Sequence, residues 1–316
     1  MRRIGFLLVE GYALISTAAA MEPLRAANLF APTALYDICF LSVDGGDVPA
    51  SLGSSFATQS IADAGLSFDL VFVVAGGDPF RFNDVRLSAW LRRLDRAGVP
   101  LGGISGGAVI LARNGLMENR RFTVHWHHLE DLRAQSAQYL LEQRLFVIDR
   151  DRYTCAGGAA PLDMMHAILS AEHGVGFAQR ISDWFIQTEI RVSHAPQQAS
   201  VAARYGIQSQ VVTEALELME SHIADPIDVG QIARLVGVSD RQLQRQFRSA
   251  LGQSVMEAYR SVRLETARSM LRGSNLSIAE IAEMAGFTSQ AHFADLYRRR
   301  WSVSPSKDRA AGRDMA

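Results

Sequence analysis

A short pattern occurs twice near the C-terminus of this 316-residue chain, at a spacing of 49 residues. The first copy has Ile232-Ala233, Gly237 and Ser239, and the second has Ile281-Ala282, Gly286 and Thr288. In each copy, Ile-Ala indicates the buried face of a short helix, Gly ends that helix where the backbone must be left-handed, and the hydroxyl residue caps a second helix. The repeat therefore predicts two helix-turn-helix units in one domain.

The second helix of each unit is predicted to bury one stripe and to leave its other face exposed. Its apolar anchors are Leu243 and Phe247 in the first copy and Phe293 and Tyr297 in the second, both spaced i, i+4. The exposed faces present side chains that hydrogen-bond base edges or neutralise phosphates when a helix lies in a major groove. The candidate DNA-binding residues are Arg241, Gln242, Gln244, Arg245 and Arg248 in the first helix, and Ser289, Gln290, His292, Arg298 and Arg299 in the second.

A long helix from Val255 to Leu271 is predicted between the two copies. It would hold the second helices of the two units, the recognition helices, about 34 Å apart. Both could then enter the major groove on one face of double-stranded DNA. Residues 240–300 contain ten arginines and six acidic residues, whereas the whole chain has a net charge of −1. This local positive charge favours specific DNA binding over non-specific coating. The alternative is a helical bundle with an arginine-rich face, which the doubled pattern disfavours.

On these motifs, the segment from about Val211 to Arg309 resembles the AraC/XylS family of bacterial transcription regulators. The resemblance includes the closing segment from Tyr297 to Pro305, in which Trp301-Ser302 stands where Phe-Gly is usual in the family. It implies a sequence-specific transcription regulator that binds promoter or operator DNA. As an activator, such a protein would also contact RNA polymerase.

The first two-thirds of the chain alternates short apolar runs with longer amphipathic ones. Four runs predict buried parallel strands, at 4–9, 38–43, 70–75 and 100–104, and residues 18–29 and 85–97 predict helices between them. The expected fold is an α/β N-terminal domain, with a parallel sheet sandwiched by helices, and an all-α C-terminal domain with two helix-turn-helix units. We place the N-terminal domain at 1–190, a linker at 191–207 and the DNA-binding domain at 208–316.

The segment from Gly102 to Ala108, Gly-Gly-Ile-Ser-Gly-Gly-Ala, predicts a strand that turns sharply into a helix. Such an elbow needs small neighbours because its central residue is strained. Ser105 is this central residue. His125, in the sequence Thr-Val-His-Trp, is a candidate partner for a nucleophile at the elbow.

These features resemble the PfpI-type branch of the class I glutamine amidotransferase-like superfamily. The segments Glu22 to Asn28, Gly76-Gly77 and Thr154 to Gly158 extend the resemblance. Enzymes of that superfamily have Cys at the elbow and often a supporting carboxylate. This chain has Ser105 instead, and no acidic residue lies between Gly11 and Met21. Because an unaided serine is a poor nucleophile, we interpret the site as a ligand pocket rather than a catalytic dyad.

The expected ligand site consists of Ser105, Gly106, Gly77, His125 and Trp126. The helix N-terminus behind Ser105 would bind a carboxylate through backbone N–H groups, and Trp126 would face a cation. A PfpI-like domain followed by a double helix-turn-helix domain is similar to the amidotransferase-like subgroup of AraC/XylS regulators. This similarity implies an effector of the arginine, glycine betaine or carnitine class, and a homodimer formed through the N-terminal domain.

Two other functions are consistent with the residues. The chain could be a hydrolase or amidase that acts through Ser105 and His125, with an appended DNA-binding module. It could also be a constitutive DNA-binding protein whose N-terminal domain only dimerises. Activity on generic substrates would indicate the first, and a DNA affinity indifferent to every metabolite would indicate the second.

No cofactor and no metal are expected. His125, His127 and His128 cannot all point one way on a strand, so we interpret them as surface residues at a strand end. Cys39 and Cys155 give no disulfide framework, and Cys155 is expected to be a buried small residue. No apolar run has the length of a membrane span or the features of a signal peptide, so we expect a cytoplasmic protein.

Overall fold

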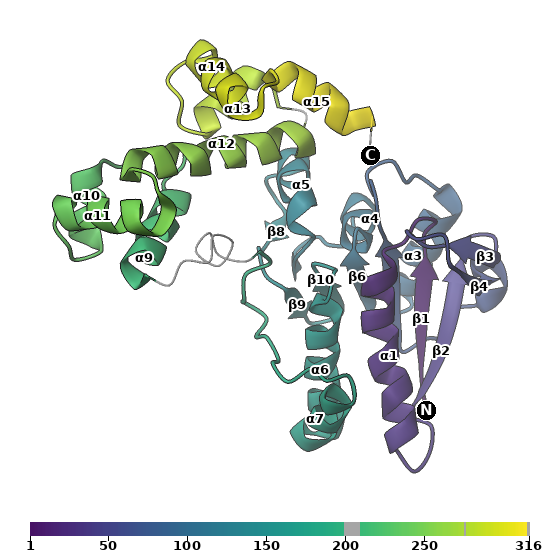
Figure 1. Cartoon of the computed structure of the whole chain (residues 1–316). Coiled ribbons are helices and arrows are strands. Elements are labelled where there is room, and N and C mark those ends of the chain that lie inside the picture. The colour runs from purple at the N-terminus through teal and green to yellow at the C-terminus, as the bar shows by residue number, and fades with distance from the viewer. Residues whose placement is uncertain (199–208, 275, 315–316) are drawn as a thin grey trace. The chain divides into compact units, whose positions relative to one another are not determined.

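The computed structural model describes residues 1–198, 209–274 and 276–314 (Figure 1). The chain divides into two compact units, residues 1–197 (unit 1) and 198–316 (unit 2). Each unit has hydrophobic cores of its own. Among the described residues, no helix is long and apolar enough to cross a membrane.

Unit 1 contains one large and one small sheet. The strands of the large sheet are β1 (Arg2–Leu8), β2 (Tyr36–Ser42), β3 (Gly46–Pro49), β4 (Ser55–Ser60), β5 (Leu70–Ala75), β6 (Leu101–Ser105), β9 (Phe146–Asp149) and β10 (Arg152–Cys155). Their spatial order is β3-β4-β2-β1-β5-β6-β10-β9, and all neighbours are parallel except the outermost pair at each edge. The small sheet pairs β7 (Arg121–Phe122) with β8 (Leu140–Leu141).

Helices cover both faces of the large sheet (Figure 1). They are α1 (Leu14–Phe30), α2 (Ile61–Ala64), α3 (Val85–Arg96), α4 (Gly107–Arg113), α5 (Leu129–Gln135), α6 (Ala160–His173) and α7 (Val175–Trp184). Alternate residues of β1 point to opposite faces, so Phe6 lies in the core with α1 and α6, whereas Leu7 lies in the core with α3 and α4. The predicted α/β sandwich is confirmed, with a mostly parallel sheet.

The four strands predicted from the sequence are the adjacent strands β2, β1, β5 and β6 in the middle of the large sheet. Strands covered on both faces are continuous apolar runs, and this is the signal that predicted them. The edge strands were missed because they lack it. Residues of β4, for example, alternate between exposed and half-buried, and the sequence Ser-Phe-Ala-Thr-Gln-Ser contains little apolar material.

The segment that leaves unit 1 is attached to it over several residues. The Arg191 guanidinium donates to the fully buried Asp163 carboxylate at 2.6 Å, and the Leu145 N–H donates to the Ser193 carbonyl at 2.9 Å. Residues 191–197 therefore belong to unit 1, so the linker begins later than the predicted residue 191. Their contacts are with distant segments, which composition does not reveal. The rest of the predicted linker, with its boundary at 207, lies outside the described residues apart from residue 198.

The described residues of unit 2 form helices joined by short turns, with no strand among them. The helices are α9 (Gln210–Ser221), α10 (Val229–Leu235), α11 (Asp240–Leu251), α12 (Val255–Gly273), α13 (Ile278–Met284), α14 (Gln290–Trp301) and α15 (Pro305–Asp314). The N-terminal half of α12, including Val255 and Tyr259, packs in one core with α10 and α11. Its C-terminal half, including Leu264 and Leu271, packs in a second core with α13 and α14. The predicted long helix is confirmed, and its two halves each complete one helix-turn-helix unit.

The two recognition helices end in the same backbone conformation with different residues. α11 ends at Gly252 with φ +68°, and α14 ends at Ser302 with φ +59°. Both residues are in the left-handed region, which glycine adopts without strain and serine does not. Trp301-Ser302 therefore forms the left-handed turn for which Phe-Gly is usual in the family. The backbone of Ser302 is strained in this turn.

Candidate functional site

The two helix-turn-helix units are built with the same local devices. Asp228 caps α10 and Ser277 caps α13, and in each case the side chain three residues later bonds back to the N–H of the capping residue. The turn that follows has a glycine in the left-handed region, Gly237 at φ +73° and Gly286 at φ +72°. The predicted repeat is confirmed as two helix-turn-helix units.

Each recognition helix begins at a serine. Ser239 accepts a hydrogen bond from the N–H of Gln242 at 3.3 Å, and Ser289 accepts one from the N–H of His292 at 3.1 Å. The cap of α14 is therefore Ser289, and the prediction of Thr288 is wrong because the second turn contains one more residue than the first. α11 and α14 are consequently equivalent at an offset of 50 residues.

The recognition helices have the same pattern of exposure at all twelve positions. Both bury the fourth and eighth residues completely, which are Leu243 and Phe247 in α11 and Phe293 and Tyr297 in α14. The exposed candidates for DNA contact are Arg241, Gln242, Arg245, Arg248, Ser289, Gln290, His292, Arg298 and Arg299. The structure leaves these side chains accessible to a groove, and their contacts with DNA stay predictions.

Some of the candidate residues have a structural role in addition. Gln244 is half-buried rather than on the exposed face, and its Oε1 accepts a hydrogen bond from the Val255 N–H at 3.4 Å. The Oε1 of Gln242 accepts from the N–H of Ser239 at 3.1 Å as part of the helix cap. Gln244 therefore faces the start of α12, and only the amide nitrogen of Gln242 is left for a ligand.

Arg263, in α12, positions α14, although no sequence motif marks it as a functional residue. Its Nε donates to the Ala285 carbonyl at 2.8 Å, and its guanidinium carbon lies 4.2 Å from the centre of the Phe287 ring. These contacts hold the turn that precedes α14. They join residues more than twenty positions apart, so neither helical spacing nor a local motif indicates them.

The elbow in unit 1 has the predicted strained geometry. Ser105 ends β6 with φ +56°, a conformation that serine rarely adopts. The neighbouring glycines are needed for close packing, since a Cβ on Gly107 would lie 1.8 Å from the Val73 carbonyl oxygen. A Cβ on Gly157 would lie 2.7 Å from the Cβ of Ser105. The predicted strand-to-helix elbow is therefore confirmed as a backbone feature.

The three segments predicted to form a pocket lie next to one another. A Cβ on Gly106 would lie 2.9 Å from the Cβ of Pro79, which follows Gly77 in the loop after β5. The ring centres of Phe80 and His128 are 5.8 Å apart, and those of His125 and Trp126 are 5.3 Å apart. The elbow, the loop after β5 and the segment after β7 thus form one region of unit 1, which we call the elbow region.

The histidines of the elbow region differ from the prediction. All three follow β7, and His127 and His128 lie in a short 3-10 helix, Trp126–His128, which His125 precedes. His128 is buried, and burial lowers its pKa to about 4. The interpretation as surface histidines is wrong for His128, because its ring packs on Phe80. In the described parts of the chain, no three His, Cys, Asp or Glu side chains are placed to hold a metal ion.

Two polar groups of the elbow region are engaged within the protein. The N–H of Gly106 donates to the Ala75 carbonyl at 3.1 Å, so it is not available for a ligand carboxylate. His125 accepts a hydrogen bond from the His127 N–H at 3.2 Å, and among the hydrogen bonds of the described residues none joins His125 to Ser105. Cys155 is fully buried as expected, and burial raises its pKa to about 12. The elbow therefore contains no paired nucleophile and base in this conformation.

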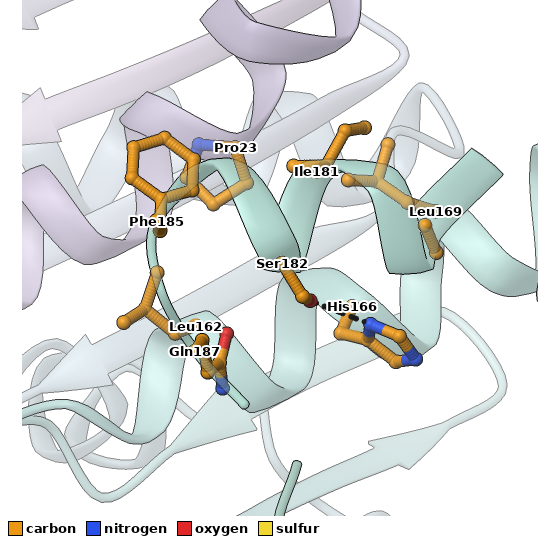
Figure 2. A pocket seen from close by; sticks show the side chains of 9 residues that line it. Pro23, Leu162, His166, Leu169, Ile181, Ser182, Phe185 and Gln187 are labelled. Carbon is orange, nitrogen blue, oxygen red and sulfur yellow. Dashed lines mark hydrogen bonds between the residues drawn. The ribbon is translucent and has the colours of Figure 1, made fainter. Parts of the chain in front are cut away.

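A recess between α1, α6 and α7 lies outside the elbow region (Figure 2). Its wall includes Pro23, Leu169 and Ile181, and the Nδ1 of His166 is 2.9 Å from the hydroxyl of Ser182. The recess is too narrow to hold a water molecule, and none of the predicted ligand residues line it. We assign no ligand to it.

An α/β domain with a strained elbow, followed by two helix-turn-helix units, defines a two-part DNA-binding protein. Residues 2–171 match the DJ-1/PfpI family, and residues 232–311 match the helix-turn-helix domain family. The chain belongs to the AraC/XylS family of transcription regulators, in the branch with an N-terminal DJ-1/PfpI domain.

Two relatives are similar to almost the whole chain. The HTH-type transcriptional regulator GlxA of Rhizobium meliloti (strain 1021) is 45% identical over 306 residues, which cover 96% of this chain and 94% of that protein. The HTH-type transcriptional regulator CdhR of Pseudomonas aeruginosa is 39% identical and covers 96% of this chain and 90% of its own length. The crystal structure of an AraC family transcriptional regulator from Pseudomonas putida has a TM-score of 0.54 at 26% identity, covering 58% of this chain and 100% of that chain.

Proposed function

We propose that the chain is a sequence-specific DNA-binding transcription regulator and not an enzyme, with α11 and α14 as its recognition helices. The main support for the proposal is the repeated helix-turn-helix unit, in which both recognition helices expose the same positions. Relatives matched over nearly their full length are named transcriptional regulators. The proposed partners are promoter or operator DNA, a second copy of the chain and, for activation, RNA polymerase. We propose that the chain acts in the bacterial cytoplasm, where these partners occur.

Arg245→Ala should weaken operator binding by roughly tenfold, because a bidentate contact between arginine and guanine contributes about 1–3 kcal/mol. The loss of sequence preference should be confined to one base pair of the site. Binding isotherms at fixed salt, on an operator selected from random DNA, measure it. Arg92→Ala, which removes an exposed arginine from unit 1, is the matched control. Equal losses in both variants would contradict a role for Arg245 in base recognition.

We propose that the elbow region binds the effector, a small nitrogenous carboxylate of the arginine, betaine or carnitine class. Trp126 is half-buried and offers an aromatic face to a cation. Burial lowers the pKa of His125 and of His128, so neither imidazole repels a cation at pH 7. The Ser105 side chain is mostly buried, at 8% exposure, and among the described residues its hydroxyl makes no hydrogen bond, so we assign the carboxylate to this hydroxyl rather than to the engaged N–H of Gly106. Gly77 lies in the adjoining loop.

Trp126→Ala should weaken the binding of a quaternary ammonium ligand by roughly tenfold, since a desolvated cation–π contact contributes about 1–2 kcal/mol. A betaine or carnitine that binds should raise the melting temperature of the wild type, and should do so much less in the variant. Trp184→Ala is the control, because Trp184 is an exposed tryptophan on α7 of the same unit. A wild-type shift that Trp126→Ala preserves would show that the ligand binds elsewhere.

The last residues of unit 1 contact the segment that leads into the elbow region. The Nε2 of Gln197 donates to the Val124 carbonyl at 3.0 Å and to the Arg144 carbonyl at 2.7 Å. Val124 immediately precedes His125, and unit 2 begins at residue 198. We propose that this contact passes a change at the effector site to the DNA-binding domain.

Gln197→Ala should leave operator affinity without effector unchanged and should reduce the change in affinity that the effector causes. The reason is that the variant removes the hydrogen bonds between the chain entering unit 2 and the segment before His125. Gln187→Ala is the matched control, because Gln187 lies earlier in the same segment and bonds instead to Asp163 at 3.0 Å. An equal loss of response in both variants would show that this segment has only a structural role.

A further inference from the structure

α11 and α14 correspond residue by residue at an offset of 50, in their serine caps and in their exposure. Side chains at the same position are therefore presented to a groove in the same way. Three exposed positions, spaced i, i+4 and i+7, form one stripe on each helix. The stripe of α11 is Arg241, Arg245 and Arg248, and that of α14 is Ala291, Asp295 and Arg298. The two recognition faces thus differ in chemistry.

The largest difference is at Asp295, where α14 has a carboxylate and α11 has Arg245. The Asp295 side chain is 50% exposed, and its Oδ2 lies 2.9 Å from an Nη of Arg299, one turn further along. An ion pair between two exposed groups contributes little stability. Among the described residues, the Asp295 side chain makes no other hydrogen bond or ion pair. The fold therefore does not explain an acidic residue on a face that would approach phosphates.

We infer that Asp295 recognises a cytosine, so that the two half-sites of the operator differ in chemistry; the inference rests on the proposed DNA-binding function. A carboxylate only accepts hydrogen bonds. In the major groove guanine presents two acceptors, thymine presents an acceptor and a methyl group, and adenine presents an acceptor beside its amino group. Cytosine presents an amino donor with no acceptor of its own beside it. It is therefore the base that suits Asp295.

The residue at the same position of α11, Arg245, is expected to prefer a different base. The Arg245 guanidinium donates two parallel hydrogen bonds, which match O6 and N7 of guanine. We therefore expect a guanine under Arg245 in one half-site and a cytosine under Asp295 in the other. The operator of this protein is not a simple repeat of one half-site.

The test starts with selection from a randomised double-stranded DNA library by the full chain. Binding is then measured on the selected operator with each base pair changed singly. Asp295→Ala should lose the preference for cytosine, about tenfold, at one base pair and keep every other preference. Asp295→Asn should prefer adenine there, because an amide pairs with N6 and N7 of adenine. Arg245→Asp is the matched variant, and it should change the preferred base in the other half-site from guanine to cytosine.

Both residues are exposed, so these variants should keep the wild-type melting temperature, which thermal unfolding checks. If the wild type selects an operator but Asp295→Ala has the same preference at every base pair, the inference is wrong and the proposed function stands. The same holds if Asp295 proves to prefer a base other than cytosine. If the wild type selects no sequence at all, the proposed function fails together with the inference.

Discussion

Gly286→Ala should destabilise unit 2 by about 3 kcal/mol or more, whereas Gly237→Ala should cost only about 1–2 kcal/mol. Both glycines are in the left-handed region, so an alanine is strained at either position. Only Gly286 is also tightly packed. Its added Cβ would lie 2.3 Å from the Ile223 carbonyl oxygen and 2.8 Å from the Pro226 side chain, whereas a Cβ on Gly237 would meet no atom within 4 Å.

Urea unfolding of the full chain, followed by tryptophan fluorescence, measures this difference; the two glycine variants leave unit 1 and its three tryptophans unchanged, so the shift between their curves reports unit 2, which contains Trp301. Gly286→Ala should also weaken operator binding, since an alanine there pushes the second turn away from the segment before α10. Gly237→Ala is the internal control with the same backbone strain. Equal destabilisation by the two variants would show that the close packing around Gly286 relaxes without cost.

Asp308→Asn should destabilise unit 2 by about 2–3 kcal/mol at pH 7. The Asp308 side chain is 5% exposed and accepts hydrogen bonds from Arg268 at 2.8 Å and from Arg272 at 2.6 Å. It also accepts one from the hydroxyl of Tyr297. Burial alone would raise the pKa of Asp308, but these hydrogen bonds outweigh it and hold the pKa at about 2. The variant leaves two arginines without their counter-charge.

The effect of Asp308→Asn should depend on pH with a definite sign. The pKa in the folded state lies below the ordinary value of 3.8, so the carboxylate stabilises unit 2 above about pH 4 and loses this effect as the pH falls through about 2. The variant and the wild type should therefore differ most at neutral pH and converge near pH 2. Asp225→Asn, at an exposed position, is the control. A difference that stays constant down to pH 2 would contradict the assignment.

The parts of the site that the sequence predicted have local causes. The left-handed turns at Gly237 and Gly286 were predictable because glycine adopts that conformation whatever surrounds it. The strained elbow at Ser105 was predictable because its neighbours had to be small. The buried faces of α11 and α14 followed from apolar residues spaced i, i+4.

The parts that the sequence did not predict depend on distant residues. Gln244 is drawn toward α12 by the Val255 N–H, although its spacing allows exposure. His128 is buried because a 3-10 helix turns its ring onto Phe80. Sequence spacing indicates on which face of a helix or strand a residue lies. It does not indicate which other element covers that face.

By itself, the sequence determined the fold class and the two helix-turn-helix units of this protein, because apolar periodicity and turn residues act within a few positions of the chain. Only the tertiary structure decided which polar groups are free to bind a ligand. The Gly106 N–H is engaged by Ala75, Asp308 is enclosed by α12 and α14, and Asp295 is left exposed. Buried hydrogen-bonding groups must find partners, and those partners come from segments that only the folded chain brings together.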